Sequence, residues 1–105
     1  MLDNNFKLIY HISMIKHIES GIMGTMLGSH SLSWIKDFAN RLKIKGVAFI
    51  KQDGSIKITA EGEEENLEKF VEEIKNEKIF TITENFYVNW SDPEENLEDF
   101  YVLTN

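Results

Sequence analysis

Apolar side chains occupy alternate positions over much of the N-terminal part of the chain. On the even positions of residues 6–22 they are Phe6, Leu8, Tyr10, Ile12, Met14, Ile18 and Ile22. A period of two is typical of extended strands. Strands usually have roughly 3–10 residues, so this run predicts two segments. We expect an N-terminal arm or extra strand within residues 1–15, centred on 6–14, and a separate strand over about 16–23.

The apolar spacing changes to three and four residues in two later stretches, which predicts two amphipathic helices. Residues 31–43 carry one stripe formed by Leu32, Ile35, Phe38, Ala39 and Leu42. Residues 63–76 carry a second stripe formed by Leu67, Phe70, Val71 and Ile74. Ser29 or Ser31 can cap the first helix, because a hydroxyl accepts hydrogen bonds from the free N–H groups there. The acidic run Glu63–Glu65 suits the positive end of the second helix dipole.

Alternation returns in the remaining segments. It predicts strands at about 45–51, 55–61, 81–90 and 99–103. Asp53-Gly54, between the first two of these strands, is a strong hairpin signal. The element order is then βαββαβ with an extra C-terminal strand. That order is typical of an α+β, ferredoxin-like sandwich, an antiparallel sheet with two helices on one face.

Length and composition favour a single domain over residues 16–105. A chain of 105 residues, 42% of them hydrophobic, can bury one modest core. Cysteine is absent, which excludes disulfides and thiolate metal sites. The apolar start is ten residues long and contains Lys7 and His11, which argues against a membrane helix or a secretory leader. We expect a cytoplasmic protein without membrane contact.

Charge is divided unevenly along the chain. Residues 1–60 hold eight Lys or Arg and four Asp or Glu, whereas residues 61–105 hold three Lys and fourteen Asp or Glu, for a net charge of −7. An acidic surface repels phosphate backbones, so nucleic acid is not an expected partner. The acidic part is interpreted as a solvated helix face and an acidic turn. A cation site at Glu63–Glu65 is disfavoured, because adjacent helical residues diverge by roughly 100°.

The histidines and tryptophans carry no clear chemical signal. His11, His17 and His30 lack the spacing of metal ligands, so neither a metal nor a cofactor is expected. Trp34 and Trp90 are expected in the core or at its rim rather than as stacking platforms.

One loop does indicate chemistry. Residues 24–32, GTMLGSHSL, precede the first predicted helix. Glycines and a helix N-terminus let backbone N–H groups surround an anion. The candidate residues for binding phosphate or sulfate in this way are Gly24, Gly28, Ser29, His30 and Ser31. No Arg or Lys lies between Lys16 and Lys36 to complete such a site.

Much of the chain resembles the acylphosphatases. Residues 45–62, KGVAFIKQDGSIKITAEG, align without a gap with a family stretch that contains a glycine, tryptophan and valine, an asparagine, an Asp-Gly hairpin and Ala-Glu-Gly, although Val47 stands where tryptophan is usual. The segment WIKDFANRLKIKG (34–46) is similar to the family's first helix. The segment NFYVNWSDP (85–93) is similar to its next-to-last strand and turn. The resemblance spans about residues 18–102.

This resemblance implies a function but also its loss. In the family, a loop with two glycines and an arginine holds the phosphoryl group of an acyl phosphate, and an asparagine eighteen residues later positions the attacking water. Gly24 and Gly28 match the two glycines. The arginine position is Leu32, and the asparagine position is Ile50. Leu32 offers no charged donor, and Ile50 can neither donate to a water nor accept from one.

Three hypotheses follow from the resemblance and the pattern. The first is an acylphosphatase-like domain without acyl-phosphate hydrolysis, retained as a binding or interaction module. The alternative is an active acylphosphatase with relocated groups, such as His30 in the loop or Lys51 beside the asparagine position. The third is a subunit that docks through residues 6–14 onto a copy of itself or onto a partner protein, because an apolar strand edge has to be covered.

Overall fold

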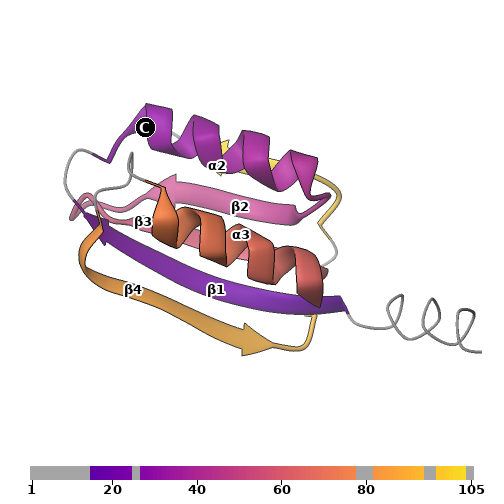
Figure 1. The fold of residues 1–105 in the computed structure, drawn as a ribbon. Helices are drawn as coiled ribbons and strands as arrows, with labels where there is room; N and C mark the ends of the chain where they lie inside the picture. Colours follow the sequence, from indigo (N-terminus) through magenta and orange to yellow (C-terminus); the bar gives the residue numbers. More distant parts are fainter. Residues whose placement is uncertain (1–14, 25–26, 78–81, 94–96, 104–105) are drawn as a thin grey trace, which may run out of the picture.

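The computed structural model describes residues 15–24, 27–77, 82–93 and 97–103 of the chain. Figure 1 shows a sheet with two helices lying side by side on one of its faces. The elements, in chain order, are β1 (Ile15–Gly24), α2 (Ser29–Arg41), β2 (Lys45–Ile50), β3 (Ile56–Glu63), α3 (Glu64–Asn76), β4 (Ile82–Ser91) and β5 (Phe100–Leu103). The predicted arm over residues 6–14 lies outside the described residues. No described helix has the length and apolar character needed to cross a membrane.

The five strands form one sheet in the order β4-β1-β3-β2-β5. The first four pair antiparallel, with β1 between β4 and β3. The predicted α+β, ferredoxin-like class is thereby confirmed, but the expectation of an antiparallel sheet holds for these four strands alone. The fifth strand, β5, runs parallel to β2, with Gly46 opposite Phe100. β4 and β5 form opposite edges of the sheet, so the chain passes from one edge to the other before β5 begins. On that far edge, β5 runs in the same direction as its neighbour β2.

The predicted boundaries agree closely with the structure except at the first helix. That helix starts at Ser29 and ends at Arg41, two residues earlier at each end than predicted. Its cap is Gly28, so the expectation that Ser29 or Ser31 is the N-cap was wrong. The predicted hairpin is confirmed, because Gly54 has a φ of 88°, a left-handed conformation that suits glycine.

The core lies between the helices and the covered face of the sheet. The two predicted helix stripes provide part of it, and even-numbered residues of β1 and β3 face them, as the two-residue period of a strand requires. The fully buried apolar residues are Ile18, Ile22, Leu32, Ile35, Ala39, Ile44, Ala48, Ile56, Ile58, Ala60, Leu67, Phe70, Ile74 and Phe100. Phe38, Leu42 and Val71, also predicted for the stripes, are partly buried against this cluster.

Candidate functional site

The end of the sheet near the start of α2 carries the loop that sequence analysis singled out. Gly24 is the last residue of β1, where a register shift separates it from Ile22. At the helix start, the N–H of Gly28 donates to Ser31 Oγ at 3.2 Å, and the Gly28 carbonyl accepts from the N–H of Ser31 at 3.0 Å. Gly28 has an extended backbone that any residue can adopt, with φ −170°. Its conformation therefore does not require glycine.

These hydrogen bonds separate the loop candidates into two groups. Ser31 is completely buried, and its hydroxyl organises the helix start rather than facing an anion. Ser29 and His30 are exposed, and they are the first two residues of the helix. A helix leaves its first N–H groups without intrahelical partners. The backbone N–H groups of Ser29 and His30 therefore have no partner within the helix, and the first turn contains no acidic residue to oppose an anion.

The two positions where the resemblance places catalytic groups lie in or against the core. Leu32 is 1% exposed and belongs to the buried cluster. Ile50 is partly buried and packs against the same cluster. Neither side chain carries a polar atom. These positions thus contribute packing, and neither the charge nor the hydrogen-bonding capacity that phosphoryl chemistry needs comes from them.

Arg41 does not replace the missing guanidinium. It lies in the last turn of α2, twelve residues after Ser29, which is roughly 18 Å along the helix axis. Its guanidinium carbon lies 5.4 Å from the centre of the Phe38 ring, a cation–π contact at the far end of the helix.

Two lysines line a hollow of about 310 Å³ beside the end of β1, together with Gly21, Met23 and Asp53. Lys57 Nζ lies 3.1 Å from Glu19 Oε1, and this hydrogen bond raises the pKa of Lys57 above its usual value of 10.5. Lys51 is exposed. Lys57 is therefore already paired, and the carboxylate of Asp53, which interacts electrostatically with Lys51, would repel an anion in this hollow.

His30 lies close to the loop. A methyl group added at Gly28 would lie 3.6 Å from His30 Nδ1, so the imidazole folds back beside the helix start. It is exposed. Among the loop candidates, His30 therefore has the side chain placed best to meet an anion at this end.

Sequence analysis missed a buried pair at the other end of the sheet. His17 on β1 is opposite Glu61 on β3, and His17 Nδ1 lies 2.8 Å from Glu61 Oε2. His17 is 1% exposed and Glu61 7%. Seven residues of β1, roughly 23 Å, separate His17 from Gly24. The pair therefore stabilises strand pairing away from the loop, and only the strand register could have shown it.

Comparisons with known proteins agree with the resemblance seen in the sequence. Residues 22–102 match the family model described as Acylphosphatase. The chain is 29% identical over 87 residues to the acylphosphatase of Salinibacter ruber (strain DSM 13855 / M31), covering 83% of this chain and 92% of that protein. The crystal structure of acylphosphatase from Bacillus subtilis superposes with a TM-score of 0.77 at 26% identity, covering 84% and 98% of the two chains.

A second acylphosphatase structure, from Coxiella burnetii, has the same fold. It matches with a TM-score of 0.73 at 19% identity and covers 89% of this chain and 97% of that one. The similarity to both structures therefore extends over nearly the whole of each.

Proposed function

We propose that this protein, which belongs to the acylphosphatase family, does not hydrolyse acyl phosphates and acts as a binding module on the family fold. The observation that supports this most is the burial of Leu32, which is 1% exposed at the position where the family resemblance places the arginine. Small movements of the loop cannot make a buried aliphatic side chain serve as a charged donor.

The chemistry of the substrate gives the physical reason. The phosphoryl oxygens of an acyl phosphate carry negative charge, which a guanidinium holds through paired, charge-assisted hydrogen bonds. Hydrolysis also needs a water directed at phosphorus, and Ile50 cannot orient one. Losing one preorganised donor typically lowers kcat by on the order of 10²–10³. Loss of both groups should therefore lower turnover by about a thousandfold or more.

Binding of a small anion is the function that the remaining groups support. The N–H groups of Ser29 and His30 project from the N-terminal end of α2, where the helix dipole favours negative charge. Phosphate and sulfate fit this chemistry. With backbone donors and no arginine, we expect weak binding, in the millimolar range.

Turnover of benzoyl phosphate tests the proposed lack of hydrolysis. Measured beside the Bacillus subtilis acylphosphatase, this protein should be slower by about a thousandfold or more. Comparable turnover would overturn the proposal. If turnover is found, His30→Ala and its matched control Ser29→Ala would show whether a relocated imidazole carries it.

A restored site provides the complementary test. The double variant Leu32→Arg, Ile50→Asn should gain turnover over the natural chain if the scaffold has only lost its chemical groups. Circular dichroism must first show that the variant is folded, because Leu32 is a core residue. A folded variant without turnover would show that the loop itself has lost the geometry for catalysis.

Amide NMR shifts test the anion site. Phosphate at millimolar concentration should move the amides of Ser29 and His30, and chloride at equal ionic strength should not. Gly28→Ala is a useful variant, because the backbone conformation allows it and its methyl group would contact the His30 ring beside the helix start. Unmoved amides in the natural protein would exclude anion binding at this helix end.

A further inference from the structure

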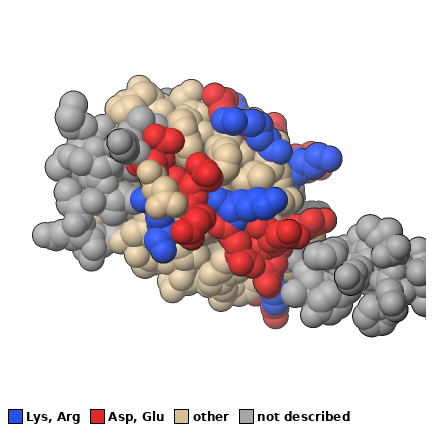
Figure 2. Space-filling model, viewed as in Figure 1, with Lys and Arg blue, Asp and Glu red and all other residues tan. Residues whose placement is uncertain are grey.

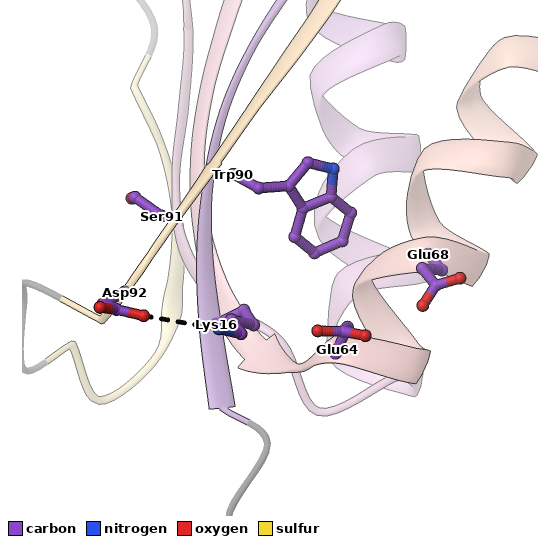
Figure 3. Close-up of a pocket in the computed structure, with 6 residues that line it drawn as sticks. All are labelled: Lys16, Glu64, Glu68, Trp90, Ser91 and Asp92. Carbon is purple, nitrogen blue, oxygen red and sulfur yellow. Dashed lines mark hydrogen bonds and ion pairs between the residues drawn. The ribbon is translucent and has the colours of Figure 1, made fainter.

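A second hollow, of about 840 Å³, lies between the start of α3 and the end of β4. Lys16, which lines this hollow, lies roughly 26 Å along β1 from Gly24. The hollow is therefore at the opposite end of β1 from the loop that contains Gly24 and Gly28. We call it the Trp90 hollow; its lining residues are Lys16, Glu64, Glu68, Trp90, Ser91 and Asp92. Figure 3 shows the indole projecting from β4 toward α3, with both glutamates projecting into the space in front of it.

The indole of Trp90 is unusually available. Trp90 is opposite Ile18 in the register of β4 and β1, so its side chain lies on the helix-covered face of the sheet. Nevertheless it is 44% exposed, because β4 is an edge strand and a hollow lies between Trp90 and the start of α3. An exposed tryptophan face attracts cations through its π-electrons more strongly than other aromatic side chains do.

The carboxylates of the Trp90 hollow outnumber its cations. Lys16 Nζ lies 3.4 Å from Asp92 Oδ1, so the lysine in the lining is already paired. Glu64 and Glu68 form no ion pair with any residue in the described part of the chain. They are four residues apart on α3 and therefore share one helix face, where like charges destabilise the helix. A cation from outside the chain would relieve this repulsion.

The surface around the hollow has the same sign. Figure 2 shows acidic side chains gathered over α3, with lysines among them. The last 45 residues, which include α3 and β4, carry fourteen of the eighteen acidic residues of the chain. A positively charged partner would therefore be attracted to this side of the molecule before contact, which increases its rate of association.

We propose that the Trp90 hollow binds an arginine side chain presented by a basic segment of a partner protein. A guanidinium is planar, so it can stack on the indole while its N–H groups donate to the carboxylates of Glu64 and Glu68. An ammonium lacks the plane needed for stacking. Tryptophan and arginine are also enriched among the residues that contribute most to binding at protein interfaces. This proposal does not depend on whether the protein hydrolyses acyl phosphates.

Titration with three short peptides of one sequence, containing arginine, lysine or citrulline at the same two positions, tests the proposal. Citrulline keeps the shape of arginine without its charge. The arginine peptide should shift the indole N–H signal of Trp90 and bind about fivefold or more tightly than the citrulline peptide. Equal binding of the arginine and citrulline peptides, or no shift at about 10 mM peptide, would overturn the proposal.

Matched variants separate the hollow from general attraction to an acidic surface. The double variant Glu64→Gln, Glu68→Gln should weaken binding of the arginine peptide by about tenfold, and Trp90→Leu by about fivefold. The control Glu72→Gln, Glu73→Gln removes the same charge from exposed positions farther along α3 and should change binding by less than about twofold. Equal effects of the two double variants would contradict a defined site. Tighter binding of free spermidine than of the arginine peptide would reassign the hollow to small amines.

Discussion

The two ends of the sheet differ in what they leave unsatisfied. At the loop end, the positions that resemblance assigns to an arginine and an asparagine hold aliphatic side chains, and Leu32 has become part of the core. At the other end, the exposed Trp90 faces two glutamates that form no ion pair with any described residue. An aliphatic side chain at a position where the resemblance places a catalytic group adds packing but cannot take part in a reaction. Like charges that form no ion pair with a described residue, beside an exposed aromatic ring, leave groups that a ligand can contact, so a new binding function is better sought at this end.

The largest expected effect comes from returning a charge to the loop end. Leu32→Arg should lower the free energy of unfolding by about 3–5 kcal/mol, because the position is buried and offers no partner for a guanidinium. Denaturant unfolding measures this. Ile50→Asn is the comparison, with an expected loss of about 1–3 kcal/mol at a partly buried site. A loss below about 1 kcal/mol for Leu32→Arg would mean that the side chain reaches solvent and that the loop end can still accept a cation.

The buried pair at the opposite end should rank next. Glu61→Ala leaves His17 Nδ1 without its partner at 2.8 Å, and His17 Nε2 has no hydrogen bond to any described residue. The expected loss of unfolding free energy is about 1–3 kcal/mol. Glu19→Ala is the control: Glu19 Oε2 is 4.0 Å from His17 Nε2 and its other oxygen pairs with Lys57 at a partly exposed site, so its removal should cost less than about 1 kcal/mol. Equal losses would show that burial of the Glu61 pair is not what matters.

The two glutamates of the Trp90 hollow should have little effect on folding. Glu64→Gln with Glu68→Gln removes a like-charge repulsion and also a favourable interaction with the helix dipole, two small terms of opposite sign. We expect unfolding free energy within about 0.5 kcal/mol of the natural protein by the same denaturant measurement. A loss above about 1 kcal/mol would make these residues structural and would remove the contrast between the two ends.

The smallest effect is expected at the hairpin beside the loop end. The hydroxyl of Ser55 and the N–H of Ser55 both donate to Asp53. These hydrogen bonds, first that of the hydroxyl and second that of the N–H, lower the pKa of Asp53 below its usual value of 3.8. A lowered pKa in the folded protein means that Asp53 stabilises the fold above that usual value and loses this contribution as the pH falls through the folded value. Asp53→Asn should therefore reduce the melting temperature near pH 7 and reduce it by less near pH 2. A reduction that is the same at both pH values would argue against the ionised carboxylate as the cause.

Most of the fold could be predicted from local pattern. The strands predicted from residue 16 onward, both helix stripes and the Asp53-Gly54 turn are confirmed, because each depends on spacing that a short segment contains by itself. The start of α2 could not be located in this way. Two serines and a glycine lay near it, and only the buried position of Ser31, with its hydroxyl accepting from the Gly28 N–H, shows which residue begins the helix.

The candidate site was predictable in its chemistry but less so in its geometry. The absence of a guanidinium at position 32 and of an amide at position 50 is a property of the side chains themselves, whatever the fold does. The separation of Ser31 from Ser29 and His30, and the pairing of Lys57 with Glu19, depend on how the chain is packed. The argument against a cation site at Glu63–Glu65 considered adjacent residues alone, and it did not consider Glu68, which lies one turn after Glu64 and lines the same hollow.

The sequence by itself determined the order of the described helices and strands, the α+β class and the aliphatic character of positions 32 and 50, because these follow from residue identity and short-range periodicity. Tertiary structure alone decided that β5 runs parallel to β2, that His17 meets Glu61 and that Trp90 faces the first turns of α3. The physical reason is that periodicity selects the face on which a side chain lies, whereas its neighbour across that face depends on strand order and register. Residues 44 positions apart, such as His17 and Glu61, become partners only through that long-range arrangement.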